Sequence, residues 1–337
     1  MKVIMVNPPF RYNNSEWITV PPQGYGGIQW IIKNISDGLL ELGHDVIILG
    51  APNSPSNHPN LTIPSVGDES EISQYLLSID KDVIIHDHTS RGIEFSQSIN
   101  WNNRNPIIHS HYLTSRPLEK KNLVAASYAH ANVIGYPGIP VIRHSVNPLN
   151  YRYSESKERY LLYLGRISNW KGVHIAAQFA QLAGYKLIMA GPSWEKDYYQ
   201  MLLDRFGSVI EYVGEVGGED KLKLLSKATA TLVFSGGLHE PTGLKWTEPG
   251  SQVVSESAIS GTPVISSDNG CLSEIVPLVG HVIKETDRLN ESIVEHVLSS
   301  LPKPCEVHTT CLKEWGYLTI AKQYEGLYRK VSGGGAW

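Results

Sequence analysis

The stretch HEPTGLKWTEPGSQVVSESAISGTPVISS, from His239 to Ser267, decides how the second half of the chain folds. Ser251 follows a Pro-Gly turn and belongs to the residue types that cap helices, and the apolar spacing after it predicts a helix that ends at Gly261. The run Pro263–Ser267 then has the pattern of a buried strand. A helix that leads directly into a short buried strand is typical of a parallel sheet covered on both faces.

The same alternation of short apolar runs and helical patterns extends along the whole chain. Strands are predicted at 2–6, 45–49, 82–86, 106–110 and 131–135, and again at 160–165, 186–191, 209–214, 229–235, 263–267 and 281–283. The pattern pauses in the polar run Asn147–Glu158. We therefore predict two doubly wound α/β domains, residues 1–150 and 151–311, with a terminal helix over 312–331 packing back on the first. The final SGGGAW is expected to be loose.

Composition narrows the classes of protein that fit. With 337 residues the chain has room for two domains, and a formal net charge of −4 with no basic run argues against nucleic acid as a partner. The three cysteines, Cys271, Cys305 and Cys311, lack metal-ligand spacing and suit a reducing compartment. No secretory signal and no apolar run long enough to span a bilayer is visible. We expect a soluble cytoplasmic protein.

The segment YLLYLGRISNWKG, Tyr160–Gly172, places two cations around one strand-to-helix turn. Arg166 comes at the carboxyl end of the predicted strand, and Lys171 precedes the next helix. Ligands of open α/β sheets bind outside the carboxyl ends of the strands, and an arginine and a lysine there would neutralise a diphosphate. The spacing fits two ordinary surface cations in a solvated loop equally well.

Three glutamates stand eight residues apart, so that two E-x7-E spacings share the middle one: Glu240, Glu248 and Glu256. The first-turn amides and the dipole of the helix beginning near Ser251 favour an anion. A diphosphate bound there would leave carboxylates for the hydroxylated rings of a ligand such as a nucleotide sugar. On spacing alone, one capping acid and one solvated helical acid explain the same pattern better.

The segment Thr247–Val276 resembles the signature of family 4 glycosyltransferases, retaining enzymes with the GT-B fold. Its E-x7-E, Gly-x-Pro-Val and Gly-x-x-x-Glu-Ile elements follow one another in the family's order. The five-residue step from Glu256 to Gly261 matches the family and selects Glu248 and Glu256 as the pair. YLLYLGRISNWKG resembles the family's Gly-Arg…Lys-Gly segment, and VPPQGYGGIQWII resembles its N-terminal Gly-Gly loop. The chain departs from the family after Glu-Pro, where an aromatic residue and then glycine are usual.

The resemblance implies a role for each matched position. The donor diphosphate would be bound by Arg166, Lys171, Gly26, Gly27, Ser251, Gln252 and Val253. Glu256 would hold ribose hydroxyls, and Glu248 would act as a catalytic residue at the transferred sugar. His111 in IIHSHYL is the best match to the family's histidine beside that sugar, with His109 as its rival. Glu240 would be a loop acid near the site.

The resemblance also implies the reaction. It indicates a metal-independent transferase without a cofactor, which takes a UDP or GDP sugar as co-substrate and a carbohydrate, lipid or small-molecule acceptor in a cleft between the domains. Peripheral contact with the inner membrane face is a further expectation, and the oligomeric state stays open. The alternatives are a sugar-nucleotide epimerase or hydrolase of the same fold and a non-catalytic nucleotide-sugar-binding protein. A nicotinamide-dependent dehydrogenase is disfavoured, because QGYGGIQ lacks the Gly-x-Gly-x-x-Gly pattern.

Overall fold

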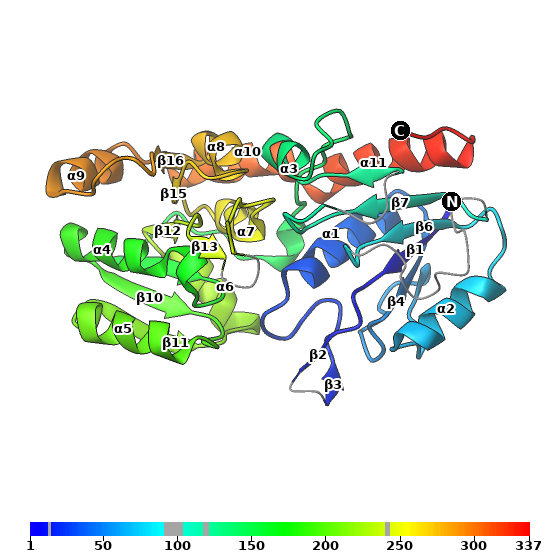
Figure 1. Cartoon of the computed structure of the whole chain (residues 1–337), viewed down its shortest axis with the longest axis horizontal. Coiled ribbons are helices and arrows are strands. Elements are labelled where there is room, and N and C mark those ends of the chain that lie inside the picture. Colours follow the sequence, from blue (N-terminus) through cyan, green and yellow to red (C-terminus); the bar gives the residue numbers. More distant parts are fainter. Residues whose placement is uncertain (13–14, 91–103, 117–120, 240–242) are drawn as a thin grey trace. The chain divides into compact units, whose positions relative to one another are not determined.

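The chain divides into two compact units, each with its own sheet. The computed structural model describes residues 1–12, 15–90, 104–116, 121–239 and 243–337. Unit 1 consists of Met1–Asn147 and Trp315–Trp337, and unit 2 of Pro148–Glu314 (Figure 1). The first division thus falls after Asn147 rather than after residue 150, and the chain returns to unit 1 at Trp315 rather than at residue 312.

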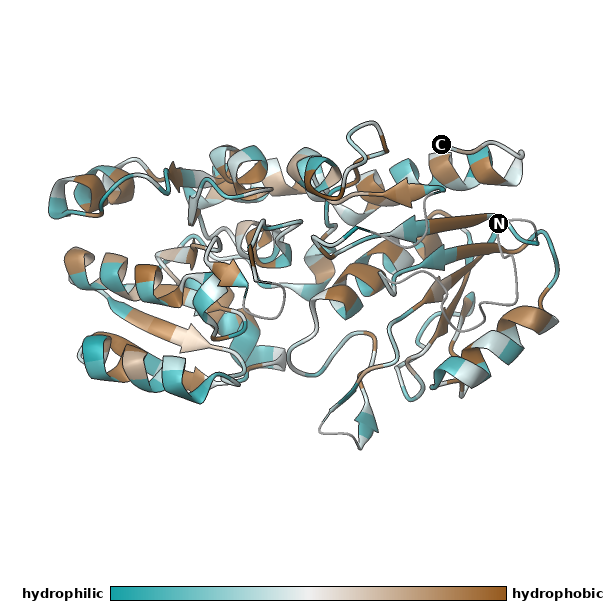
Figure 2. Ribbon diagram, in the orientation of Figure 1, coloured by the Kyte–Doolittle hydropathy of each residue, from teal (hydrophilic) through white to brown (hydrophobic). Residues whose placement is uncertain are grey.

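Unit 1 contains a six-stranded parallel sheet. Its strands lie in the order β5 (Leu61–Thr62), β4 (Asp45–Leu49), β1 (Lys2–Val6), β6 (Ile84–Asp87), β7 (Ile107–Ser110) and β8 (Leu123–Val124). Val3 pairs with Val46 on one side and with Ile84 on the other. These strands are almost continuously apolar, as their colours show (Figure 2), because helices cover both faces of a parallel sheet.

Unit 2 repeats this topology in its own six-stranded parallel sheet. The order is β11 (Ile210–Gly214), β10 (Lys186–Ala190), β9 (Tyr160–Leu164), β12 (Ala230–Val233), β15 (Val264–Ser267) and β16 (Gly280–Ile283). In both sheets the chain first builds outward on one side of the first strand and then on the other. The strand order therefore reverses between β1 and β6 and between β9 and β12, and the predicted two-domain Rossmann-like α/β class is confirmed.

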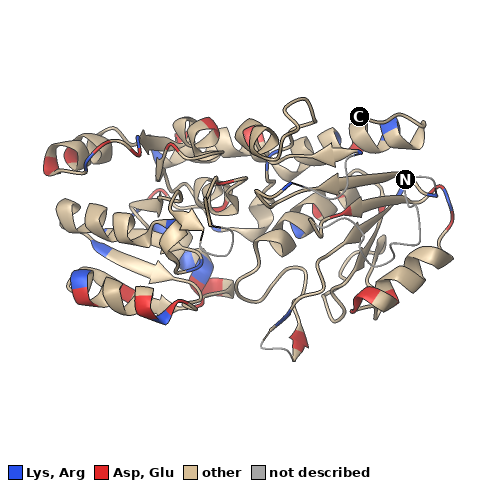
Figure 3. Ribbon diagram, viewed as in Figure 1, with Lys and Arg blue, Asp and Glu red and all other residues tan. Residues whose placement is uncertain are grey.

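Helices connect these strands within each unit. Unit 1 has α1 (Gly27–Glu41), α2 (Glu69–Ser78), α3 (Tyr128–Val133) and α11 (Tyr317–Ser332). Unit 2 has α4 (Val173–Ala183), α5 (Lys196–Phe206), α6 (Gly218–Lys227), α7 (Gln252–Ile259), α8 (Leu272–Ile275) and α9 (Glu291–Ser299), and α10 (Pro304–Trp315) leads out of it. Helix α4 carries no charged residue (Figure 3) and buries Phe179 completely. In unit 1, α11 approaches α1 so closely that a β-carbon at Gly38 would lie 2.6 Å from the Tyr317 carbonyl oxygen.

Two short antiparallel hairpins extend from the main sheets. They are formed by β2 (Arg11–Tyr12) with β3 (Glu16–Trp17) and by β13 (Leu238–His239) with β14 (Leu244–Lys245). In the described part of the chain, no helix combines the length and the apolar character needed to cross a membrane.

Three local predictions are wrong. The run 131–135 lies in and just after helix α3 instead of forming a strand, because the Ser127 side chain accepts a hydrogen bond from the His130 amide and caps the helix. The terminal helix is two helices, since the chain breaks at Gly316, where Val146 pairs with the backbone on either side. The final segment is held, because Trp337 Nε1 donates to the Leu123 carbonyl at 2.6 Å.

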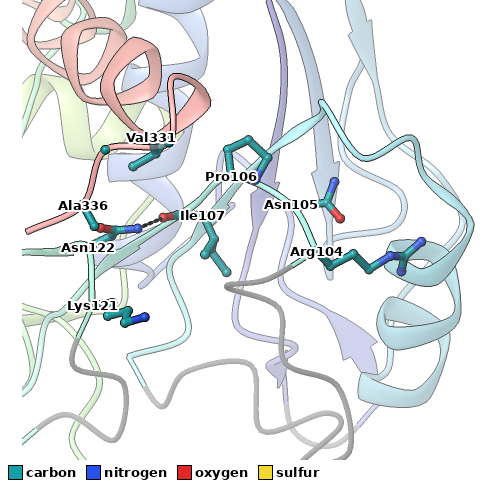
Figure 4. Close-up of a pocket in the computed structure, with 10 residues that line it drawn as sticks. Arg104, Asn105, Pro106, Ile107, Lys121, Asn122, Val331 and Ala336 are labelled. Atoms are coloured by element: carbon teal, nitrogen blue, oxygen red, sulfur yellow. Dashed lines mark hydrogen bonds between the residues drawn. The ribbon is translucent and has the colours of Figure 1, made fainter.

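A cavity of about 260 Å³ lies at the start of β7 in unit 1 (Figure 4). Arg104, Asn105 and Lys121 contribute its polar lining. The Arg104 guanidinium donates to the carbonyls of Leu76 and Leu77, so that this cation caps the end of α2. The cavity lies at the amino end of the strand, whereas sheets of this kind bind their ligands outside the carboxyl ends.

Candidate functional site

The site in unit 2 begins at the switch point between β9 and β12. Arg166 follows β9 after one glycine, and the turn Lys171–Gly172 leads into α4. Gly172 has φ of 67°, and a β-carbon there would lie 2.0 Å from the Phe234 carbonyl oxygen. The turn therefore packs directly on the backbone that leaves β12, which only glycine permits. This contact brings Lys171 to the carboxyl ends of both central strands.

Lys171 and Glu248 form a buried ion pair there. Lys171 Nζ donates to Glu248 Oε2 at 2.6 Å, and Trp246 Nε1 donates to the same oxygen at 2.9 Å. The side chains are 20% and 7% exposed. Burial by itself would raise the pKa of Glu248, but the charge and hydrogen bond of Lys171, with hydrogen bonds from Trp246 and Ser235, bring its pKa below the ordinary value. Glu248 is therefore a carboxylate at neutral pH.

The backbone of Glu248 is held by the loop that follows β15. Its amide donates to Asn269 Oδ1 at 2.8 Å, and its carbonyl accepts from the Cys271 amide at 2.8 Å. Gly270, between these two residues, has φ of 55°. A β-carbon on Gly270 would lie 2.3 Å from the Glu248 carbonyl oxygen. The Gly-x-x-x-Glu-Ile loop of the sequence thus acts as a clamp that sets the position of Glu248.

Aromatic rings surround Lys171 and Arg166, the two cations predicted to bind the donor diphosphate. Lys171 Nζ lies 4.8 Å from the ring centroid of Trp170 and 5.0 Å from that of Trp246, and these two indoles are 4.6 Å apart. The Arg166 guanidinium lies 4.3 Å from the ring of Trp194 and 5.6 Å from that of Trp170. Such cation–π contacts restrain long side chains. The sequence patterns did not single out these three tryptophans, although two of them adjoin the motifs in NWKG and KWTEP.

Glu256 lies on α7 and forms a second buried ion pair. Glu256 Oε1 accepts from Lys221 Nζ at 2.9 Å and from the Tyr151 hydroxyl at 3.0 Å. Neither partner was predicted, because Lys221 comes from α6 and Tyr151 from the segment before β9. Both carboxylates of the E-x7-E pattern are thus paired with a lysine from another element of unit 2.

The start of α7 differs in one respect from the prediction. Ser251 occupies the N-cap position, but its buried side chain makes no capping hydrogen bond. Gln252 and Val253 lie in the first turn and are half-buried. An isolated helix leaves the amides of its first turn unsatisfied, and here the Val254 amide donates to the Ser251 carbonyl at 3.3 Å. Glu240 lies outside the described residues.

The glycine pair of unit 1 lies at the start of α1. Gly26 is the N-cap residue, and a β-carbon there would lie 2.8 Å from Cβ of Pro22, whereas Gly27 has open space around it. Gln29 Nε2 donates to Asn7 Oδ1 at 2.9 Å, which ties the first turn to the carboxyl end of β1. The helix therefore begins at the ligand-binding edge of the unit 1 sheet.

The two rival histidines of unit 1 have different partners. His109 Nδ1 lies 3.0 Å from Asp87 Oδ2, and its buried Nε2 has no partner among the described residues. His111 Nε2 lies 2.9 Å from the Ser115 carbonyl, and its ring stacks on His130 with 5.6 Å between centroids. Burial lowers the pKa of His111, and its hydrogen bonds to the backbone of Ser115 and Ser90 oppose this shift. His111 is thus a neutral, restrained imidazole.

The other strand-end histidines are buried in a polar network with α11. His86 contacts the Tyr328 hydroxyl through Nδ1 and Ser110 Oγ through Nε2, both at 2.8 Å. Ser110 Oγ also lies 3.1 Å from the Tyr324 hydroxyl, and His88 Nδ1 lies 2.6 Å from that of Tyr112. In the described ranges no group of three or more His, Cys, Asp or Glu has the arrangement of a metal site. This network joins α11 to the sheet.

Two doubly wound parallel sheets, the second with the buried Lys171–Glu248 pair beside its switch point, define a two-domain Rossmann-like α/β protein. The family model for glycosyl transferases group 1 matches residues 152–302. The crystal structure of AviGT4, a glycosyltransferase involved in avilamycin A biosynthesis, is 42% identical, covers 100% of this chain and 99% of its own, and superposes with a TM-score of 0.94. The chain belongs to the group 1 glycosyltransferases, and it has the GT-B fold.

More distant relatives agree with this assignment. An uncharacterized glycosyltransferase of Methanocaldococcus jannaschii is 24% identical over 76% of this chain and 80% of its own length. The glycogen synthase of Mycobacterium tuberculosis is 31% identical over 42% of this chain, which is 34% of the synthase. The Anabaena protein HepE, solved with UDP-glucose, shares the fold with a TM-score of 0.70 at 15% identity, covering 98% of this chain and 100% of its own.

Proposed function

We propose that this glycosyltransferase moves a sugar from a nucleotide-diphosphate donor to an acceptor hydroxyl, with retention of the anomeric configuration and without a metal ion, as family 4 enzymes do. The observation that carries the proposal is the Lys171–Glu248 contact of 2.6 Å. It joins two separate sequence motifs at the switch point of the unit 2 sheet, where doubly wound folds bind nucleotides.

The reaction breaks the bond between the sugar and the diphosphate, so that negative charge grows on the leaving phosphate. Arg166, Lys171 and the first-turn amides of α7 would stabilise this charge, and one well-placed donor of this kind contributes about 3 kcal/mol. With the charge neutralised by the protein's own cations, a metal ion is not required. The acceptor hydroxyl attacks from the face that the phosphate leaves, and the departing phosphate accepts the proton.

Glu248 and Glu256 divide the remaining contacts of the donor. Glu248 would contact the transferred sugar, and Glu256 would hold the ribose hydroxyls. Gly26 and Gly27 would let the start of α1 approach the donor phosphate. His111 stays a prediction as a catalytic residue, and His109 stays its rival, because His109 has the buried nitrogen without a described partner.

The donor base is proposed to be uracil or guanine, with uracil tested first. The Anabaena protein HepE has been solved with UDP-glucose, and TarM of S. aureus with UDP and α-GlcNAc-glycerol. The 42% identical relative acts in avilamycin A biosynthesis, which favours a biosynthetic intermediate among the acceptor classes. We expect the enzyme to act in the cytoplasm.

The test combines the purified protein with UDP and GDP sugars and with panels of carbohydrate and small-molecule acceptors, in the presence of EDTA. Mass spectrometry should detect a glycosylated product, and its NMR spectrum should show the anomeric configuration of the donor. Inverted configuration, or activity that EDTA abolishes, would contradict the proposed mechanism. Release of free sugar with every acceptor would indicate a hydrolase instead.

A further inference from the structure

Three side chains from separate segments of unit 2 meet at Glu256. Glu256 lies on α7, Lys221 on α6, and Tyr151 in the segment before β9. The side chains of Lys221 and Glu256 are only 9% and 5% exposed. Lys221 Nζ and the Tyr151 hydroxyl both donate to one oxygen, Glu256 Oε1, at 2.9 and 3.0 Å.

The second oxygen of this carboxylate, Glu256 Oε2, lacks such donors among the described residues. Within the described part of the chain, no side chain or amide donates to Glu256 Oε2. A carboxylate accepts hydrogen bonds at both oxygens, and a carboxylate removed from water costs free energy unless both are satisfied. Lys221 and Tyr151 thus hold one oxygen of Glu256, and the other oxygen remains able to accept hydrogen bonds from a bound molecule.

Stability alone is a poor reason for this arrangement. A buried ion pair loses about as much hydration energy as it gains in attraction, and well-packed apolar side chains of similar volume often serve a fold as well. Such a pair does fix the orientation of a carboxylate, because two donors on one oxygen restrict rotation of the side chain. The geometry therefore suits positioning better than stabilisation.

We propose that Lys221 and Tyr151 are positioning residues, which hold Glu256 through Oε1 so that Oε2 accepts the ribose hydroxyls of the donor. The proposal rests on the proposed function, since it assumes a nucleotide donor with its ribose at Glu256. It extends that function by naming two further residues that determine selectivity. The preference for a ribose with both hydroxyls depends on Lys221 and Tyr151 as well as on Glu256.

The test measures two ligands that differ only in the ribose. Isothermal titration calorimetry compares UDP with 2′,3′-dideoxy-UDP for the unaltered protein and for Lys221→Met, Tyr151→Phe and Glu256→Gln. The exposed Lys223 on the same helix supplies the matched control, Lys223→Met. The unaltered protein and the control should prefer UDP by about tenfold or more, the usual effect of a hydrogen bond to a charged group.

Lys221→Met and Tyr151→Phe should bind UDP more weakly and dideoxy-UDP as before, so that the preference shrinks toward one. A merely structural role would weaken both ligands equally. If Lys221→Met does not fold, Tyr151→Phe, which removes a single hydroxyl, gives the decisive comparison.

The remaining outcomes separate failure of the positioning proposal from failure of the proposed function. If Glu256→Gln loses the preference while Lys221→Met and Tyr151→Phe keep it, the positioning proposal is overturned and the proposed function stands. If Glu256→Gln keeps the preference, the ribose assignment fails, and the positioning proposal fails with it. If the unaltered protein binds neither UDP nor GDP, the proposed function itself is contradicted.

Discussion

Lys171 Nζ lies 2.6 Å from Glu248 Oε2, and 77 positions of sequence separate the two residues. Both side chains are largely buried, so that removing one partner leaves an uncompensated charge. We predict that Lys171→Met lowers the free energy of unfolding by about 3 kcal/mol, and that Lys171→Met combined with Glu248→Gln costs less than the sum of the single changes. Urea unfolding of the unaltered protein, the two single variants and the double variant measures the coupling energy between Lys171 and Glu248.

The control is the pair Arg152–Glu219, whose side chains are 50% and 75% exposed. The same cycle there should give a coupling below about 1 kcal/mol, because water screens exposed pairs. Equal couplings for the two pairs would show that Lys171 and Glu248 do not share a buried contact.

The buried histidines of unit 1 make stability depend on pH. Burial lowers the pKa of His88 from its usual 6.5 to about 3 and lowers the pKa of His86 well below 6.5. Below about pH 6.5 these two histidines are protonated in the unfolded chain but stay neutral in the folded one. The free energy of unfolding therefore falls as the pH falls. Asp87 has a lowered pKa, so the stability that it contributes is lost only below about pH 4. This loss lies below the range in which the histidines act.

Between pH 7 and pH 5, His88 alone should account for about 2 kcal/mol of this loss. The drop in unfolding free energy between pH 7 and pH 5 should therefore be about 2 kcal/mol smaller in His88→Gln than in the unaltered protein. His58→Gln, at an exposed position, should leave the difference unchanged. A pH effect that is the same in all three proteins would contradict the neutral, buried state of His88.

Gly270 should tolerate no side chain. It has φ of 55°, and a β-carbon would lie 2.3 Å from the Glu248 carbonyl oxygen. We predict that Gly270→Ala displaces Glu248 and lowers the melting temperature more than Gly218→Ala does. Gly218 has φ of 50° but open space around it, so that its substitution costs only the backbone strain, about 1 kcal/mol. Similar losses in both variants would mean that the loop after β15 does not clamp Glu248.

Local patterns in the sequence predicted the fold well where they repeat. Nearly continuous apolar runs located β1, β4 and β9, because a strand buried on both faces is largely apolar. The same signal failed at 131–135, since a short apolar run also fits a helix, and the deciding contact is the Ser127 cap. Trp337 was missed because its partners, Asn122 and Leu123, lie more than 200 residues away.

The candidate site was predictable only in part. The resemblance to the family's motifs, rather than spacing alone, named Lys171, Glu248 and Glu256, and the structure places the first two in contact. Lys221 belongs to an ordinary amphipathic helix, and nothing in its local pattern separates it from the exposed Lys223. Its partner is on another helix 35 positions away, so that only the tertiary fold reveals the pair.

The proposed role of Lys171 is tested by the rate at which Lys171→Met cleaves a UDP or GDP sugar, followed as released nucleotide in the presence of acceptor. Loss of the cation that stabilises the leaving diphosphate should lower kcat/KM by about 10²-fold or more. Lys186→Met, at the exposed amino end of β10, should retain the unaltered rate. A folded Lys171→Met protein that cleaves the donor as fast as Lys186→Met would show that Lys171 does not stabilise the leaving diphosphate.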